Sequence, residues 1–257
     1  MWDVSAFVGV WPFRQLPDAG NQNALEKRLR ECGITRAYVS PLEALFHADP
    51  MPVNAVWASR LADSDFFRFV PVLNPSLPLD AEQTLAKLRE LPGSLAAIRL
   101  HPNYHGYSLD SEAVRLLTRK AGEAGLPVIV QVQMQDVRGM HPLVRVPDTD
   151  PATVLALASE CPETTIVAAG VRWGAAKALA KGAAETSDRL YLEISHMEYV
   201  DPIRQFIDQF GTDRLLPGSH APLLTPAALK MKLDAARLSP NERESIAIGN
   251  ARKAGFQ

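Results

Sequence analysis

The sequence predicts a mixed α/β fold, an eight-stranded (β/α)8 barrel of the TIM type. Short apolar runs alternate with longer segments of helical periodicity along the whole chain, as in parallel sheets wrapped by crossover helices. This unit recurs about eight times, and 257 residues is a usual length for one closed barrel. We therefore expect a single domain over residues 1–257. A distorted barrel, or an incomplete one with seven strands, is the nearest alternative.

The eight expected strands share short length and an abundance of Val, Ile and Leu, as expected for strands buried on both faces. They are Trp2–Phe7, Ala37–Ser40, Phe69–Leu73, Ala97–Leu100, Pro127–Val132, Thr165–Ala169, Leu190–Ile194 and Arg214–Gly218.

The segments between the strands have the 3.6-residue periodicity of helices. We expect helices at Asn23–Glu31, Asn54–Asp63, Ala81–Leu91, Asp110–Ala124, Pro151–Ser159, Ala175–Ala184 and Asp201–Phe210, and two extra C-terminal helices at Pro226–Arg237 and Asn241–Ile248. Asp110 and Asp150 are suited to N-caps, and Gly33, Gly125 and Gly211 to left-handed positions after helices.

Composition narrows the classes of function. The 27 basic and 29 acidic residues are interspersed, so no basic surface for nucleic acid or an anionic membrane is expected. No apolar run approaches the roughly 18 residues of a membrane span, and no secretory signal opens the chain, which favours a cytoplasmic protein. Cys32 and Cys161 lack metal or redox spacing. Dinucleotide, Walker, nucleophile-elbow and zincin motifs are also absent, so no cofactor is expected.

Three segments resemble the amidohydrolase-related (amidohydrolase-2) family. RLLPGSHAP, at Arg214–Pro222, resembles the last strand of that barrel. IRLHPNYHGYSLD, from Ile98, resembles the segment after the fourth strand, and IAIGNARKAGF, ending at Phe256, resembles the closing helix. The motifs occur in the family's order over nearly the full chain, so the resemblance implies a hydrolase on a barrel frame.

The metal ligands that the resemblance implies are missing. The family's first strand carries His-x-His, where this chain has Ser5 and Phe7, and the eighth-strand aspartate is replaced by His220. Where the family has histidines, the fifth strand offers Gln131 and Gln133 and the sixth offers Ala168 and Ala169. We therefore expect no metal at the family site, because these side chains lack imidazole and carboxylate donors.

Polar residues gather where the predicted strands end, which is the catalytic face of such barrels. Five of the six histidines fall on these predicted loops: His101, His105, His141, His196 and His220. His220 is the candidate general base, because imidazole titrates near neutral pH, with Glu193 as orienting carboxylate and His196 as a further catalytic candidate.

The remaining candidates would bind substrate. Arg99 and Arg138 suit a carboxylate, although internal ion pairs such as Arg138 with Asp136 or Arg99 with Glu193 are the competing interpretation. The other expected contacts are His101, Gln131, Gln133, His141 and Trp11.

Three functions fit these residues. The first is a metal-independent hydrolase acting on a small carboxylated lactone, ester or amide. The second is a non-catalytic barrel that binds a small molecule or a partner subunit, including a second copy in a homodimer. The third is a relocated metal site drawn from His101, His141, His196 and His220, which their spacing supports least.

Overall fold

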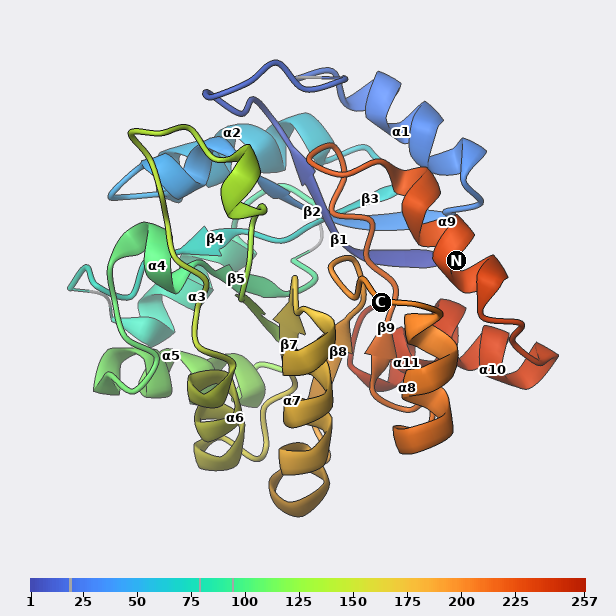
Figure 1. Cartoon of the computed structure of the whole chain (residues 1–257). Helices are drawn as coiled ribbons and strands as arrows, with labels where there is room; N and C mark the ends of the chain where they lie inside the picture. The colour runs from blue at the N-terminus through green and yellow to red at the C-terminus, as the bar shows by residue number, and fades with distance from the viewer. Residues whose placement is uncertain (19, 79, 94) are drawn as a thin grey trace.

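The strands form a parallel (β/α)8 barrel in this computed structural model, which describes residues 1–18, 20–78, 80–93 and 95–257 (Figure 1). All strand pairs are parallel and run in chain order. The strands are β1 (Trp2–Val8), β2 (Arg36–Pro41), β3 (Phe67–Phe69), β4 (Val72–Leu73), β5 (Ile98–Leu100), β6 (Val128–Gln131), β7 (Ile166–Ala169), β8 (Leu190–Glu193) and β9 (Leu215–Leu216). The predicted fold class is confirmed.

The barrel closes between its first strand, β1, and its last strand, β9. Val4 N–H donates to the Pro217 carbonyl (2.9 Å), His220 N–H to the Ser5 carbonyl (2.8 Å), and Phe7 N–H to the Ala221 carbonyl (2.7 Å). These bonds continue the pairing of β9 beyond its two regular residues, so β1 has a partner on each side.

The predicted third strand, Phe69–Leu73, is divided into β3 and β4 at Val70 and Pro71. Proline has no N–H for the ladder, which interrupts regular pairing. Backbone bonds still hold the segment in place: Val70 N–H donates to the Val39 carbonyl, and the Pro71 carbonyl accepts from Arg99 N–H, both at 2.9 Å. β3 and β4 together therefore fill one strand position, which gives eight positions in the barrel.

Helices surround the strands (Figure 1). The helices are α1 (Gln22–Glu31), α2 (Met51–Leu61), α3 (Ala81–Arg89), α4 (Pro102–His105), α5 (Glu112–Glu123), α6 (Pro151–Glu160), α7 (Trp173–Thr186), α8 (Pro202–Phe210), α9 (Pro226–Ala235), α10 (Pro240–Glu244) and α11 (Asn250–Lys253), with 3-10 turns η1 (Glu43–Phe46) and η2 (Val137–Gly139) and a π-helical turn η3 (Ser245–Gly249).

Local chemistry explains most helix ends. Asp150 caps α6, accepting a hydrogen bond from Ala152 N–H (2.9 Å), as predicted. The predicted cap Asp110 is wrong, because α5 begins one residue later, where the Ser111 side chain accepts from Val114 N–H. Gly33, Gly125 and Gly211 all adopt positive φ, which glycine tolerates best.

Two further helix predictions need correction. The expected final helix, Asn241–Ile248, is instead α10, η3 and α11 in succession, because a π-helical turn interrupts it. His105, expected on a loop, is the last residue of α4, which Pro102 initiates and the left-handed Gly106 ends. Among the described residues, no helix is long and apolar enough to cross a bilayer.

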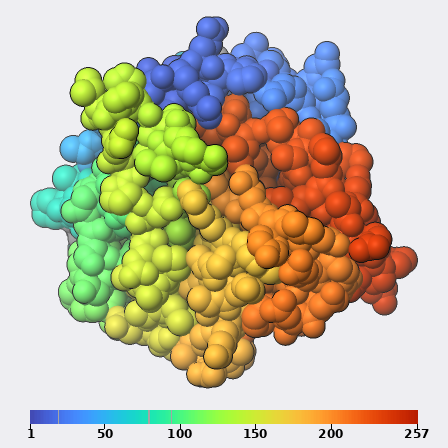
Figure 2. All heavy atoms as spheres, in the orientation of Figure 1, coloured from blue at the N-terminus to red at the C-terminus, as the bar shows by residue number. Residues whose placement is uncertain are grey.

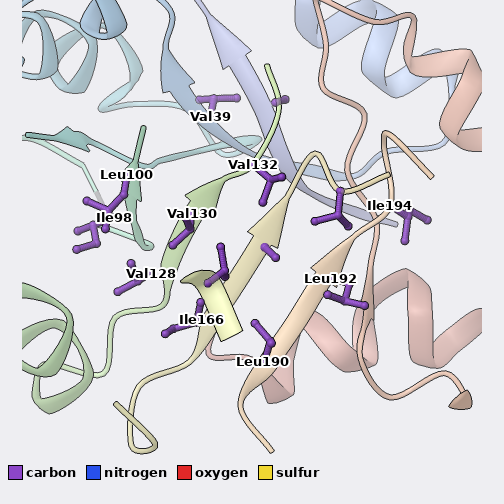
Figure 3. Packing of buried hydrophobic residues seen from close by; sticks show 14 of the residues in the cluster. Val39, Ile98, Leu100, Val128, Val130, Val132, Ile166, Leu190, Leu192 and Ile194 are labelled. Atoms are coloured by element: carbon purple, nitrogen blue, oxygen red, sulfur yellow. The ribbon is translucent and has the colours of Figure 1, made fainter. Parts of the chain in front are cut away.

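Side chains alternate between the two faces of each strand, and both faces are buried. One set of side chains faces the helices, for example Ile98 and Leu100 on β5 and Leu190 and Leu192 on β8 (Figure 3). The residues between them face the barrel interior. The interior side chains at one end of the barrel are apolar. We call them the lower layer; they include Val4, Val70, Ala97, Ile129, Val167, Tyr191 and Leu216.

The chain's last residues close the lower end of the barrel. Ala251, Ala254 and Phe256 pack against the interior apolar cluster, and the Phe256 ring lies 4.8 Å from that of Tyr38. The Tyr38 hydroxyl donates to the backbone carbonyl of Gln257 (2.9 Å). The lower end is therefore a filled core, which leaves the opposite end for a site.

Candidate active site

Three inward-facing polar residues form a second layer, here called the upper layer, next to the apolar lower layer inside the barrel. Arg99 follows Ala97 by two residues on β5, Gln131 follows Ile129 on β6, and Glu193 follows Tyr191 on β8. A period of two places each pair on the same face of its strand. Arg99 and Glu193 are fully buried and Gln131 nearly so, so the strands bring three of the predicted site residues into the barrel interior.

The Arg99 guanidinium is at the centre of this polar layer. Nη1 donates to Gln131 Oε1, and both Nη1 and Nη2 donate to Ser5 Oγ (3.2 Å each). The central carbon of the guanidinium lies 4.7 Å from the centre of the Phe7 ring. Nε has no partner among the described residues. Burial lowers the pKa of Arg99 to about 10, although Glu193 and Asp3 oppose that effect, so it stays charged at neutral pH. Among the described residues neither carboxylate forms an ion pair with Arg99, so the competing interpretation of an Arg99–Glu193 pair is wrong.

This donor set does not suit a divalent metal ion. Phe7, Ala168 and Ala169 have no side-chain donor atoms, and the Ser5 and Gln131 oxygens are already bonded to Arg99. The described residues contain no group of three histidine, cysteine, aspartate or glutamate side chains that could hold a metal. The permanent positive charge of Arg99, which is bonded to Ser5 and Gln131, would also repel a cation.

Glu193 is held by three hydrogen bonds at the end of β8. Its Oε2 accepts from Gly170 N–H and from the Ser195 hydroxyl (both 2.9 Å), and Oε1 accepts from Ser195 N–H (2.5 Å). Burial raises the pKa of Glu193, while these bonds favour its charged form. Gly218 leaves room for the carboxylate, because a Cβ there would lie 2.1 Å from Oε1.

His196 is connected to Glu193 through Ser195. The Ser195 hydroxyl lies 2.8 Å from Nδ1 of His196 and also reaches Glu193. His196 keeps 7% of its surface exposed, and its Nε2 has no hydrogen-bond partner among the described residues. Burial, followed by the charges of Lys232 and Arg172, lowers the pKa of His196 to about 4, so the ring is neutral at pH 7.

His220 is in edge contact with His196, with ring centres 4.6 Å apart. Its Nε2 lies 2.6 Å from the Met134 carbonyl, so this nitrogen carries the proton and donates. Burial lowers the pKa of His220 well below its ordinary value, and the neighbouring His196 ring lowers it further. The buried Nδ1, which is then unprotonated, has no partner among the described residues.

The backbone at His220 adopts a left-handed conformation, with φ of 54°. Such a conformation is strained for a residue other than glycine and persists where neighbours enforce it. Here the buried Asp3 carboxylate accepts from Ser219 N–H (2.9 Å) and from the Ser219 hydroxyl, and so fixes the preceding residue. The strain marks this end of the barrel as specialised.

The loop from β6 to α6 covers the mouth. It rises above the barrel and then descends to α6 (Figure 1). Its surface abuts the N-terminal segment (Figure 2), and the ring centres of Phe13 and His141 lie 5.9 Å apart. Met134 of this loop packs with Phe7 and Trp11. A hollow lined by His101, Tyr104, Gln131 and loop residues leaves only about 10 Å³, room for about one water molecule.

The other predicted contacts divide between this buried site and its rim. His101 is almost fully buried, with neither ring nitrogen bonded among the described residues, and Trp11 is buried in the apolar cluster under the loop. Gln133 accepts a hydrogen bond from Arg172 Nε (3.0 Å).

Two predicted substrate contacts lie outside the buried cluster. Arg138 is 86% exposed and pairs with Asp136 (2.8 Å), the competing interpretation stated above. His141 is exposed on the same loop. Neither residue belongs with the buried cluster, because the loop carries both to the surface.

The sequence did not indicate four residues of the site. Ser195, Asp3 and Met134 contribute bonds described above, and Lys232 of α9 donates to the carbonyls of Ile194 (2.7 Å) and Ser195 (2.8 Å). Asp3 and Ser195 lie two residues from the predicted site residues Ser5 and Glu193, but strand alternation does not indicate them, because the register of β1 shifts between Asp3 and Ala6 and β8 ends at Glu193. Lys232 looks like an ordinary helix-surface lysine, and its contact depends on how α9 packs.

One family model matches most of the chain. It is described as amidohydrolase and covers residues 48–254. No curated protein matches the sequence significantly.

Solved structures at low identity share the fold. An uncharacterized TIM-barrel protein from Bordetella bronchiseptica is 16% identical, with a TM-score of 0.73 over 98% of this chain and 97% of that one. A dihydroxybenzoic acid decarboxylase from Polaromonas, with bound manganese and 2-nitroresorcinol, is 14% identical, with a TM-score of 0.75 over 98% and 96%. A probable 2-pyrone-4,6-dicarboxylic acid hydrolase from Acinetobacter baumannii, with citric acid bound, is 13% identical, with a TM-score of 0.66 over 99% of each chain.

Proposed function

Because this chain belongs to the amidohydrolase family, we propose that it is a metal-independent hydrolase of a small carboxylated lactone, ester or amide. The observation that carries the proposal is the chain of contacts from Glu193 through Ser195 to His196 beside a buried, permanently charged Arg99. A neutral imidazole and a fixed cation are the two elements that hydrolysis without a metal needs.

In this proposal His196 supplies the base. Nε2 accepts a proton from water, the water oxygen attacks the substrate carbonyl carbon, and the departing oxygen or nitrogen takes up the proton as its bond to that carbon breaks. We favour His196 over the sequence-based candidate His220, because His220 is fully enclosed and its Nε2 already donates to Met134. His220 then packs against the edge of the His196 ring.

Arg99 is the proposed binding group for the substrate carboxylate. Its Nε–H is free of partners among the described residues, and a guanidinium pairs well with a carboxylate. The names of the decarboxylase and the pyrone hydrolase above also denote carboxylated ring compounds. Entry requires the β6–α6 loop to move, because about 10 Å³ cannot hold such a molecule.

The test is a hydrolysis screen over carboxylated lactones, esters and amides, with and without a chelator. We expect turnover that the chelator leaves unchanged. His196→Gln should lower kcat/KM by about 100-fold or more, as expected for loss of a general base, and the exposed His47→Gln should leave it unchanged. Turnover that requires added manganese or zinc would contradict the proposal.

One observation favours the alternative of a non-catalytic barrel that binds a small molecule or a partner subunit. Arg99, His101 and His220 are all at most 1% exposed, so the mouth is filled by the protein itself. This alternative predicts saturable binding of a carboxylate by calorimetry, and no product from any bound compound after prolonged incubation.

A further inference from the structure

Lys232 extends from α9 to the end of β8. Its Nζ donates to the backbone carbonyls of Ile194 (2.7 Å) and Ser195 (2.8 Å). Burial lowers the pKa of Lys232, an effect that Glu193 and Glu198 oppose. Lys232 is half-buried, and an ammonium group withdrawn from water is unfavourable unless it is hydrogen-bonded and near opposite charge. Both conditions are met here.

These two carbonyls belong to the turn that carries His196. Met197 N–H donates to the same Ile194 carbonyl (3.2 Å), which closes a turn over residues 194–197. Lys232 therefore holds the backbone immediately before His196, while Ser195 holds its ring through Nδ1. Both the backbone and the side chain of this turn are anchored by polar contacts.

The hydrogen-bond directions determine which nitrogen of His196 carries the proton. Each Glu193 oxygen accepts from a backbone N–H, of Gly170 or of Ser195, and these bonds favour the ionised carboxylate, which can only accept. The Ser195 hydroxyl therefore donates to it. The Ser195 oxygen must then accept from His196, which places the ring proton on Nδ1. Nε2 is left with its lone pair.

We propose that Lys232 and Ser195 are positioning residues that hold His196 with its proton on Nδ1 and its Nε2 free to accept one. The inference rests on the proposed function, in which His196 is the base. Lys232 acts through the turn and through its charge, and Ser195 acts as the relay to Glu193.

Charged and titratable groups face His196 from several elements. Lys232 approaches from α9, Arg172 from the start of α7, Asp136 from the β6–α6 loop, His220 from the loop after β9 and Glu193 from β8. Burial has the largest effect on the pKa of His196, Lys232 and Arg172 lower it further, and Asp136 opposes them. Removing the Lys232 charge should therefore raise the proton affinity of His196.

The experiment is long-range ¹H–¹⁵N NMR of the histidine rings in the ligand-free protein, titrated with acid. In the wild type we expect His196 to carry its proton on Nδ1. Lys232→Met should raise its proton affinity by about tenfold, a change typical of one nearby charge in a partly buried site. Lys232→Arg, which keeps the charge, should not, and neither should Lys230→Met, on the exposed side of the same helix.

Ser195→Ala gives an independent readout that does not depend on the folding of the lysine variant. It should shift the ring proton of His196 toward Nε2, and Ser195→Thr, which keeps the hydroxyl, should restore Nδ1. An unchanged tautomer in Ser195→Ala, or an unchanged titration in a folded Lys232→Met protein, would overturn the proposal. These spectra need no substrate, so a protein with the expected tautomer and no turnover would reject the proposed function instead.

Discussion

Two layers inside the same barrel, separated by a single residue along each strand, differ completely in chemistry. On β5, β6 and β8 the lower layer contributes Ala97, Ile129 and Tyr191, and the upper layer Arg99, Gln131 and Glu193. Burial is nearly complete in both. Solvent exposure therefore does not explain the polar residues, and the comparison points to a function for the upper layer.

The two layers also differ in how well their polar atoms are satisfied. In the lower layer the Tyr38 hydroxyl donates to Gln257. In the upper region Arg99 Nε, both nitrogens of His101 and Nδ1 of His220 have no partner among the described residues. Buried unsatisfied groups are unfavourable by about 1–3 kcal/mol each. The lower end of the barrel thus stabilises the fold, whereas the upper end contains buried polar groups that lower stability, as is common at functional sites.

The largest expected effect tests the stabilising end. Phe256→Ala should lower the free energy of unfolding by about 3–5 kcal/mol, because it empties a fully buried aromatic position against Tyr38. Urea unfolding measures this change. The exposed Lys253→Ala, in the same segment, should leave the midpoint unchanged. A small effect of Phe256→Ala would mean that the last residues are not part of the core.

A smaller effect is expected at Gly170, where the end of β7 contacts the β6–α6 loop. In Gly170→Ala a Cβ would lie 2.3 Å from the Gln133 carbonyl, and φ at Gly170 is +71°. We expect a loss of about 1–3 kcal/mol in the free energy of unfolding from the clash and the left-handed backbone. Gly174→Ala is the matched control, because no atom lies within 4 Å of its Cβ and helical alanine is favourable. Equal effects at both glycines would contradict this account.

His101→Leu should stabilise the protein by about 1 kcal/mol at pH 7, because it removes two unsatisfied nitrogens from a buried position. Burial lowers the pKa of His101 well below 6.5, so the folded state keeps this ring neutral while the unfolded chain binds a proton below pH 6.5. The wild type should therefore lose stability relative to the variant as pH falls, by up to about 1.4 kcal/mol per pH unit. Urea midpoints of both proteins at pH 7 and 5.5 measure this difference in stability. A difference that is the same at both pH values would show that His101 titrates in the folded protein as it does in the unfolded chain.

The smallest effect is expected at the rim. Arg138→Ala breaks a pair with Asp136 that is open to solvent, and such pairs contribute little. The unfolding midpoint should stay unchanged, and so should kcat/KM on any substrate found in the screen. A strong rise in KM would indicate that movement of the loop brings Arg138 into the site.

The sequence predicted the fold well because strand patterns and their order are local properties. The eight apolar runs and the polar residues where they end were sufficient to place Arg99, Gln131, Glu193 and His196 at one end.

The failures involve contacts between distant segments. Nothing local indicates that Lys232 reaches the β8 turn, or that the Met134 carbonyl meets His220. The position of Arg138 depended on the path of a loop without a regular pattern. The division of the third strand, by contrast, could have been anticipated from Pro71.

The bond between Met134 and His220 has a kinetic consequence. A ligand that reaches Arg99 must first displace this contact and the loop that makes it, so association should be slow and should depend on the population of the opened form. The apparent dissociation constant would equal the intrinsic one divided by that fraction. A loop change that favours opening would therefore tighten binding and hasten entry without altering any residue that contacts the ligand.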